Sequence, residues 1–299
     1  MELKEAIKHS LGAIGRLRLA TILNLPFVKR QLVRTPDESG WHRVHPFDGL
    51  YGTDTSGYVG VEQLPEGTSG ACHAMAYAGS QPSVVRAALR CLPTAKDYSF
   101  IDLGCGKGRA LLVASELPFK ALMGVELNSG LARIAERNAT IIKQPEQGQT
   151  LVRIIVGDAS AFPLPPGNLV LFMYHPFDAE LIAKVVANIE AALTAERREI
   201  FVIYGNPVHA ACLDDSPLLF RRFACMIPYS RDEIGFGPDD SDAVAIWEGG
   251  PSAVPATTPQ ANIVVAEGNK RAWIIDSELQ MSASGGQSIF ARASARASA

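Results

Sequence analysis

The chain has 299 residues, 47% of them apolar, with a formal net charge of −3 and a sequence pI near 6.1. This apolar content is enough for one sizeable core, and the slightly acidic balance lacks the bulk basic signature of a nucleic-acid-binding protein. The scattered cysteines show no C-x-x-C spacing and no apolar run approaches the roughly 18 residues of a membrane span, so we expect a cytoplasmic protein with neither disulfides nor a zinc site.

Residues 1–75 are predicted to form a basic N-terminal helix and a covering loop. Over residues 1–34, apolar residues such as Ile7, Leu11 and Ile14 recur at helical spacing between lysines and arginines, which favours a helix packed on the domain. The alternative is peripheral contact with an anionic membrane surface through the same basic helix.

Residues 51–57 are rich in Gly, Thr, Asp and Ser, which stabilise turns. This stretch is either a structural loop or a loop that covers a ligand. His42 and His45 have the spacing of a metal pair, but no third ligand is nearby and Pro46 argues against a helix that would align the two rings. No metal site is therefore predicted.

Strand and helix patterns alternate over residues 76–250, which we predict to be the main domain. A helix with Pro82 in its first turn runs to Leu92. The further predicted elements are a strand ending at Asp102, strands over 121–126, 151–156, 169–174 and 200–204, and helices beginning at 110 and spanning 129–142 and 178–195. Apolar strands separated by helices indicate a parallel sheet covered on both faces. Residues 218–227 and 243–247 have no long helix between them, which indicates an antiparallel pair at one edge.

The composition shifts to Pro, Ala, Ser, Thr and Gly after residue 250. Residues 251–299 are therefore predicted to be a low-complexity, mostly disordered tail. Within it, residues 263–265 and 273–275 have the pattern of a short hairpin, because Gly268 and Asn269 lie between them.

A glycine-rich loop, Gly104-Cys105-Gly106-Lys107-Gly108, follows the opening strand directly. Glycine lets the backbone turn tightly and approach a ligand, and the helix that follows presents free N–H groups. A Walker A loop is disfavoured, since Gly108 stands where Ser or Thr is needed. The dinucleotide fingerprint places its third glycine one position later than Gly108, so the spacing here favours an adenosine that bears an amino acid over a pyrophosphate.

Acidic residues end or follow the next two strands, Glu126 the second and Asp158 the third. The Glu126 carboxylate can accept two ribose hydroxyl hydrogen bonds, and Asp158 can accept one from an adenine amine. Backbone N–H groups near Gly104 and Gly106 suit a ligand carboxylate. The simpler interpretation of both acids is helix capping.

Residues 98–178 resemble the core of the class I S-adenosylmethionine-dependent methyltransferases. Residues 102–108 match the family's first motif, and Glu126 and Asp158 match its ribose- and adenine-binding acids. The resemblance implies an α/β fold with a Rossmann-like, mostly parallel seven-stranded sheet and an antiparallel edge hairpin, methyltransferase activity, and S-adenosyl-L-methionine as cofactor. The cofactor-binding residues that it implies in the core are Asp102, Gly104, Cys105, Gly106, Gly108, Glu126, Leu127, Asp158 and Ala159.

The segment before the core is similar to that of an uncharacterised bacterial subgroup, distantly similar to protein-lysine methyltransferases. In that subgroup the segment folds over the cofactor, which makes Tyr77, Ser80 and Thr55 further candidate contacts.

Tyr174-His175-Pro176-Phe177 follows the fourth strand, where acceptor groups lie in this family. Methyltransferases that act on amino nitrogens often carry Asn/Asp-Pro-Pro-aromatic there, and this chain is similar in part. Tyr174, His175 and Phe177 are therefore the predicted catalytic residues: a neutral histidine can accept a hydrogen bond from the target N–H while an aromatic ring packs beside it. A hydrogen-bonded loop residue is the alternative role for His175.

The favoured function is methyl transfer to a protein side chain such as lysine, or to another amino nitrogen. A small metabolite is the alternative acceptor. A non-catalytic module that binds an adenosine ligand and an NAD-dependent enzyme are the rival functions. No nucleic-acid partner is expected, and the sequence leaves the oligomeric state open.

Overall fold

The computed structural model describes residues 43–60, 76–141, 152–237, 239–255, 261–266 and 271–275. The predicted basic helix within residues 1–34 and the tail after residue 275 lie outside these ranges. None of the helices within them has the length and hydropathy needed to cross a membrane.

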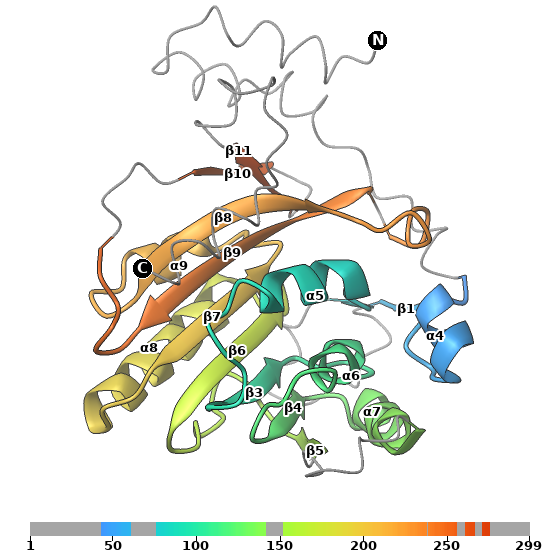
Figure 1. The fold of residues 1–299 in the computed structure, drawn as a ribbon, viewed down its shortest axis with the longest axis horizontal. Coiled ribbons are helices and arrows are strands. Elements are labelled where there is room, and N and C mark those ends of the chain that lie inside the picture. Colours follow the sequence, from blue (N-terminus) through green and yellow to red (C-terminus); the bar gives the residue numbers. More distant parts are fainter. Residues whose placement is uncertain are drawn as a thin grey trace, which may run out of the picture.

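A seven-stranded sheet forms the middle layer of the described part of the chain (Figure 1). In spatial order its strands are β5 (Val152–Val156), β4 (Leu122–Glu126), β3 (Tyr98–Leu103), β6 (Asn168–Tyr174), β7 (Ile200–Gly205), β9 (Ser241–Gly249) and β8 (Phe220–Pro228). The strands from β5 to β7 pair in parallel, whereas β9 pairs antiparallel with both β7 and β8. The predicted mostly parallel sheet with an antiparallel edge hairpin is confirmed.

Helices cover both faces of this sheet, as its continuous apolar strands require. They are α5 (Pro82–Leu89), α6 (Arg109–Ala114), α7 (Ser129–Ile141), α8 (Ala179–Ala195) and α9 (Ala210–Asp214). Consecutive residues of β3 point to opposite faces: Phe100 packs with α5 and α6, and Ile101 packs with α8 and α9. The sheet thus separates two apolar layers.

A short helix and a two-stranded ribbon precede α5. Helix α4 (Pro46–Tyr51) is followed by β1 (Tyr58–Val59), which pairs antiparallel with β2 (Tyr77–Ala78). We call residues 43–60 and 76–81 the pre-core segment. Its hydrogen bonds to Arg109 of α6 and Asn138 of α7 hold it on that side of the sheet (Figure 1).

A separate hairpin of β10 (Asn262–Ala266) and β11 (Arg271–Ile275) follows the sheet in the chain, as the Gly268-Asn269 pair predicts. Ala272 and Ile274 are buried in the same apolar layer as α8, and β11 contacts β8 and β9. The hairpin predicted within the otherwise low-complexity segment is therefore present. An existing sheet can bury a short apolar hairpin whatever the composition of the sequence around it.

Candidate functional site

A cavity of about 360 Å³ lies at the carboxyl ends of β3, β4, β5 and β6, where open α/β sheets bind ligands. Most residues predicted to bind the cofactor or to act on the acceptor meet there. Those that line the cavity are Tyr77, Ser80, Asp102, Gly104, Cys105, Gly106, Glu126, Leu127, Asp158, Ala159, Tyr174, His175 and Phe177. Thr55 and Gly108 lie outside the lining.

The glycine loop turns tightly against two neighbouring segments. Gly104 and Gly106 have φ angles of 82° and 55°, in the left-handed region that glycine adopts without strain. A Cβ atom on Gly104 would lie 2.8 Å from Cβ of Pro176, and one on Gly106 would overlap the ring of Tyr77. Both glycines are thus needed for close approach of residues that line the cavity.

The structure gives Gly108 a role that differs from the predicted one. It precedes α6 with a φ of 85°, and a Cβ atom there would lie 3.2 Å from Cβ of Ala135 in α7. Its role is the packing of α6 against α7, whereas the resemblance implied contact with the cofactor.

Two buried carboxylates, Asp102 and Glu126, line the cavity together. Glu126 accepts the backbone N–H groups of Gly106 and Asn128, each at 2.8 Å, and the Gly104 N–H donates to the Val125 carbonyl at 2.9 Å. The N–H groups of Gly104 and Gly106, predicted to suit a ligand carboxylate, therefore have protein acceptors instead. Burial nevertheless raises the pKa of Glu126. Burial, and then the charge of Glu126, raise the pKa of Asp102 well above its usual value. Such a pair favours a ligand with a cationic group, which would offset the cost of both charges.

Asp158 and Cys105 also line the cavity, together with the polar residues Arg109, Asn128 and Ser129. Asp158 Oδ1 accepts the N–H and the hydroxyl of Ser160 at 2.8 Å and 2.7 Å, which fixes the carboxylate just after β5. Burial, followed by the charge of Asp102, raises the pKa of the Cys105 thiol well above its usual value. The thiol therefore stays neutral and is no nucleophile.

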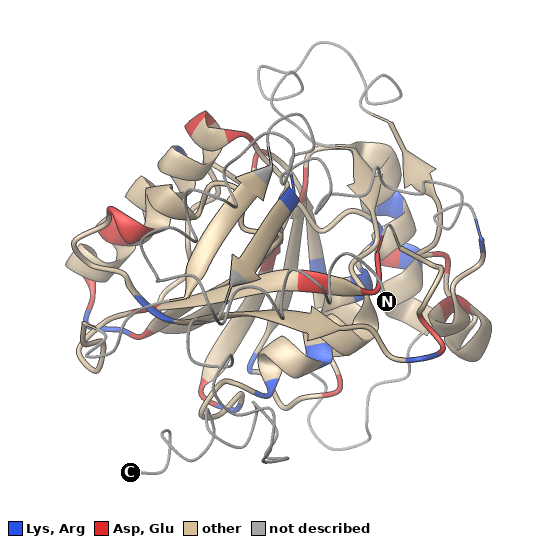
Figure 2. Ribbon diagram, turned by 90° about the horizontal axis from the view of Figure 1, so that it is seen from above, with Lys and Arg blue, Asp and Glu red and all other residues tan. Residues whose placement is uncertain are grey.

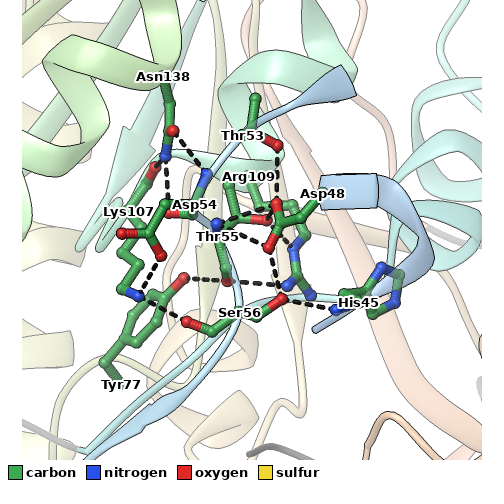
Figure 3. A network of polar contacts seen from close by, with 10 residues as sticks. All are labelled: His45, Asp48, Thr53, Asp54, Thr55, Ser56, Tyr77, Lys107, Arg109 and Asn138. Atoms are coloured by element: carbon green, nitrogen blue, oxygen red, sulfur yellow. Dashed lines mark hydrogen bonds and ion pairs between the residues drawn. The ribbon is translucent and has the colours of Figure 1, made fainter. Parts of the chain in front are cut away.

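The pre-core segment is held together by a buried polar network (Figure 3). Asp48 accepts hydrogen bonds from the Thr53 hydroxyl at 2.7 Å, from the Thr55 N–H and hydroxyl at 2.9 Å and 2.6 Å, and from the Ser56 hydroxyl. Burial alone would raise the pKa of Asp48, but these hydrogen bonds lower it. The Tyr77 hydroxyl donates to the Thr55 carbonyl at 2.7 Å. Thr55, predicted to contact the cofactor, is instead buried behind Tyr77 and supports it.

Two basic residues that were not predicted join this network to the glycine loop (Figure 3). Arg109, buried at the start of α6, donates from Nε and Nη2 to the hydroxyl and carbonyl of Thr55 at 2.7 Å and 2.8 Å. Its Nη1 also donates to the Gly79 carbonyl at 3.1 Å. Lys107 Nζ forms an ion pair with Asp54 at 2.8 Å. The sequence feature that could have identified these two residues is their position in or beside the glycine motif.

Tyr174 reaches the cavity from the end of β6. Its hydroxyl donates to Asp242 Oδ1 at 2.7 Å. Burial, and then the nearby Asp242 charge, raise the pKa of Tyr174 well above its usual value. The hydroxyl is thus a fixed donor at neutral pH, and what Tyr174 offers a substrate is aromatic surface.

His175 has a φ of 40°, which few residues other than glycine adopt. Its backbone N–H donates to the Gly205 carbonyl at 3.1 Å, so the unusual backbone is held by the neighbouring strand end. The His175 ring lies 5.5 Å, between centroids, from the ring of His209. Phe177, also buried, follows in the lining.

Apolar and small residues make up most of the lining that sequence reasoning missed. They include Ala76, Ala78, Val125, Leu131, Phe172 and Leu181. These residue types carry no chemical signal, and only the folded chain shows that they face a cavity.

No protein-family model matches the chain, and no curated protein matches it. A Listeria monocytogenes structure, provisionally described as a class I S-adenosylmethionine-dependent methyltransferase, matches with a TM-score of 0.43 and 16% identity over 60% of this chain and 63% of its own. A TehB-like S-adenosylmethionine-dependent methyltransferase from Corynebacterium glutamicum matches with a TM-score of 0.38 and 17% identity over 56% of this chain and 88% of its own. The 23S rRNA methyltransferase ErmE matches with a TM-score of 0.41 and 12% identity over 60% of this chain and 71% of its own.

These likenesses are too distant to establish a shared activity, and the chain spans less than two thirds of the Listeria protein. The fold rests on the strand order itself. The mostly parallel seven-stranded sheet with its antiparallel edge pair is the architecture that the resemblance to class I S-adenosylmethionine-dependent methyltransferases implied.

Proposed function

We propose that this chain is an S-adenosylmethionine-dependent methyltransferase. The proposal is carried by one observation: the ends of three neighbouring strands bring the glycine loop, Glu126 and Asp158 to a single cavity. The acceptor that we favour is an amino nitrogen, such as that of a protein lysine, and a small molecule is the alternative.

The chemistry of the lining suits this cofactor. S-adenosylmethionine carries cationic ammonium and sulfonium groups, which would favour the ionised forms of the buried carboxyl groups Asp102 and Glu126. A carboxylate offers about four acceptor sites, so Glu126 can still accept from ribose hydroxyls beside its two backbone hydrogen bonds. Asp158 would accept from the adenine amine, and Tyr77 would cover the ligand. When bound, the cofactor supplies an electrophilic methyl group.

The acceptor end of the cavity must orient an amine and receive its proton. Lysine has an ordinary pKa of about 10.4, so its amine is mostly protonated at neutral pH. Histidine is the side chain whose ordinary pKa, about 6.5, suits proton acceptance there. We assign His175 this role, with Tyr174 and Phe177 packing beside the amine to hold it in line.

The distribution of charge over the described residues favours an acceptor other than nucleic acid. Lysine and arginine are interspersed with aspartate and glutamate over the described part of the molecule (Figure 2). A polyanionic acceptor is usually bound by a stripe of basic residues, because phosphate contacts dominate such affinities.

Calorimetric titration with S-adenosylmethionine and with NAD tests the cofactor. We expect binding of S-adenosylmethionine by the wild type, weakened by Glu126→Ala. Unchanged affinity in that variant contradicts the proposal, and tight binding of NAD alone selects the dehydrogenase alternative. Asp97→Ala, on an exposed turn, is the matched control.

A second experiment tests catalysis and the acceptor. The protein is incubated with cofactor labelled in its methyl group and with fractionated cell extract, and label is sought on proteins and on small molecules. His175→Ala should lower transfer far more than cofactor affinity. Binding without transfer to any fraction would favour the non-catalytic binding module.

A further inference from the structure

The hairpin of β10 and β11 carries a buried arginine beside the acceptor end of the cavity. Arg271, the first residue of β11, is 7% exposed. Its Nη2 lies 3.1 Å from Asp242 Oδ1 and donates to the Ser241 carbonyl at 2.8 Å. Its Nε lies 3.4 Å from Asp239 Oδ2. The guanidinium is thus bound to the start of β9, the strand next to β7 in the sheet.

Asp242 links Arg271 to the cavity. The same Oδ1 atom accepts the Tyr174 hydroxyl at 2.7 Å. Asp242 is almost completely buried, and burial raises its pKa while the charge of Arg271 acts in the opposite direction. Without Arg271, Asp242 would be a buried charge with a lost ionic partner, which proteins rarely tolerate. The fixed position of the Tyr174 hydroxyl therefore depends on the arginine.

The next residue of β11 contacts the neighbouring strand end. The Ala272 N–H donates to Asn206 Oδ1 at 2.7 Å. Asn206 follows Gly205, the residue whose carbonyl accepts the His175 N–H. Two adjacent residues of β11 therefore contact Asp242, which binds Tyr174, and Asn206, which follows the residue that binds His175.

We propose that Arg271 is a positioning residue for the acceptor end of the cavity, acting on Tyr174 through Asp242 and through its own contact with the Tyr174 side chain. The consequence for methyl transfer rests on the proposed function. The coupling between the hairpin and Tyr174 does not rest on the proposed function, so the coupling and the effect on methyl transfer can be tested separately.

A double-mutant cycle in urea denaturation tests the coupling. We expect Tyr174→Phe to lower the unfolding midpoint in the wild type and to lower it much less in Arg271→Met, where Asp242 has already lost its anchor. Additive shifts of the midpoint would overturn the proposal. If Arg271→Met yields no folded protein, Arg271→Lys takes its place with the same expectation, because one ammonium cannot reproduce all the contacts of a guanidinium.

Arg221 provides a matched control. Its Nη1 donates to the Ala261 carbonyl at 3.0 Å, just before β10, and its Nε pairs with Asp214 at 3.1 Å. Arg221→Met therefore also loosens the hairpin, but Arg221 lies opposite Trp247, toward the other end of β9 from Asp242. Its effect should add to that of Tyr174→Phe, and coupling equal to that of Arg271→Met would count against the proposed path.

Activity provides the second readout. Arg271→Met should keep its affinity for S-adenosylmethionine and lose roughly tenfold or more in labelled methyl transfer, since small misplacements near the reacting groups are costly. Arg271→Lys should restore part of that transfer. Equal losses in affinity and transfer would show a general structural role and overturn the assignment. If the wild type binds no S-adenosylmethionine, the proposed function fails while the denaturation cycle still decides the coupling.

Discussion

At the scale of single residues, ionised Asp102 lowers the stability of the ligand-free protein but should strengthen cofactor binding. Its raised pKa means that folding favours the protonated carboxyl, so the ionised form destabilises the ligand-free protein as pH rises above the unfolded value of about 4. We expect Asp102→Asn to stabilise the ligand-free protein at neutral pH by about 0.5–2 kcal/mol. The same change should weaken S-adenosylmethionine binding by roughly tenfold or more, because a charged hydrogen bond contributes about 1.5–3 kcal/mol.

Thermal unfolding of the ligand-free protein and calorimetric titration measure the two effects of Asp102→Asn. Asp97→Asn, at an exposed position, controls for the loss of one negative charge. A destabilised variant that binds the cofactor normally would show that Asp102 has a structural role only.

A second prediction at the scale of single residues concerns Gly106. Its φ of 55° and its contact with the Tyr77 ring leave no room for a side chain. Gly106→Ala should therefore displace Tyr77 and weaken cofactor binding, with a backbone cost of about 1–2 kcal/mol for the left-handed conformation. Gly49→Ala in α4, where a Cβ atom meets nothing within 4 Å, is the control, and similar affinities in the two variants would refute the covering role of Tyr77.

At the scale of elements, His45 makes the pre-core segment sensitive to pH. His45 is the N-cap of α4: its Nδ1 accepts the Phe47 N–H at 3.1 Å, and its Nε2 lies 2.9 Å from Gln81 Oε1. This pairing places the proton on Nε2 of a neutral ring. Burial, and then the charge of Arg109, lower the pKa of His45.

A lowered histidine pKa contributes stability that is fully present above the unfolded value of about 6.5 and is lost as pH falls through it. We expect the free energy of unfolding to fall between about pH 7.5 and pH 5.5, by at most about 1.4 kcal/mol per pH unit from this one group, and the unfolding temperature to fall with it. His45→Asn keeps a capping side chain without the titration and should fall less steeply. Parallel curves for the two proteins would remove His45 as the cause.

The elements differ in how far the sequence could predict them. The parallel strands could be predicted because their apolar runs are buried on both faces, and the site acids because they stand at strand ends. The pre-core segment could not, because it is held by polar contacts between distant positions, such as the Asp54 N–H and Asn138 Oδ1, which are 84 positions apart. The burial of Arg271 likewise depends on β9, and a sequence of low complexity around it gives no sign of that contact.

At the scale of the whole molecule, the cavity is built where three parts of the chain meet. The sheet edge supplies the acids, the pre-core segment supplies Tyr77, and the hairpin supports Tyr174. Cofactor affinity should therefore depend on the contacts that hold these parts together as well as on contacts with the ligand. Arg109 of α6 lines the cavity and also holds the pre-core segment, since it donates to Thr55, Gly79 and Ser80.

Arg109→Met keeps a long buried side chain but removes these donors, so buried acceptors in the pre-core segment lose their partners at a cost of about 1–3 kcal/mol each. We expect faster amide hydrogen exchange over residues 53–56 and 77–80, weaker S-adenosylmethionine binding, and little change in exchange within β8 and β9. Arg86→Met is the matched control, because the Arg86–Glu116 ion pair is partly exposed and such pairs contribute about 0–1 kcal/mol. If exchange rises equally in all parts of the Arg109 variant, the arginine stabilises the whole fold; if it rises only in the pre-core segment while affinity is unchanged, that segment does not cover the cofactor.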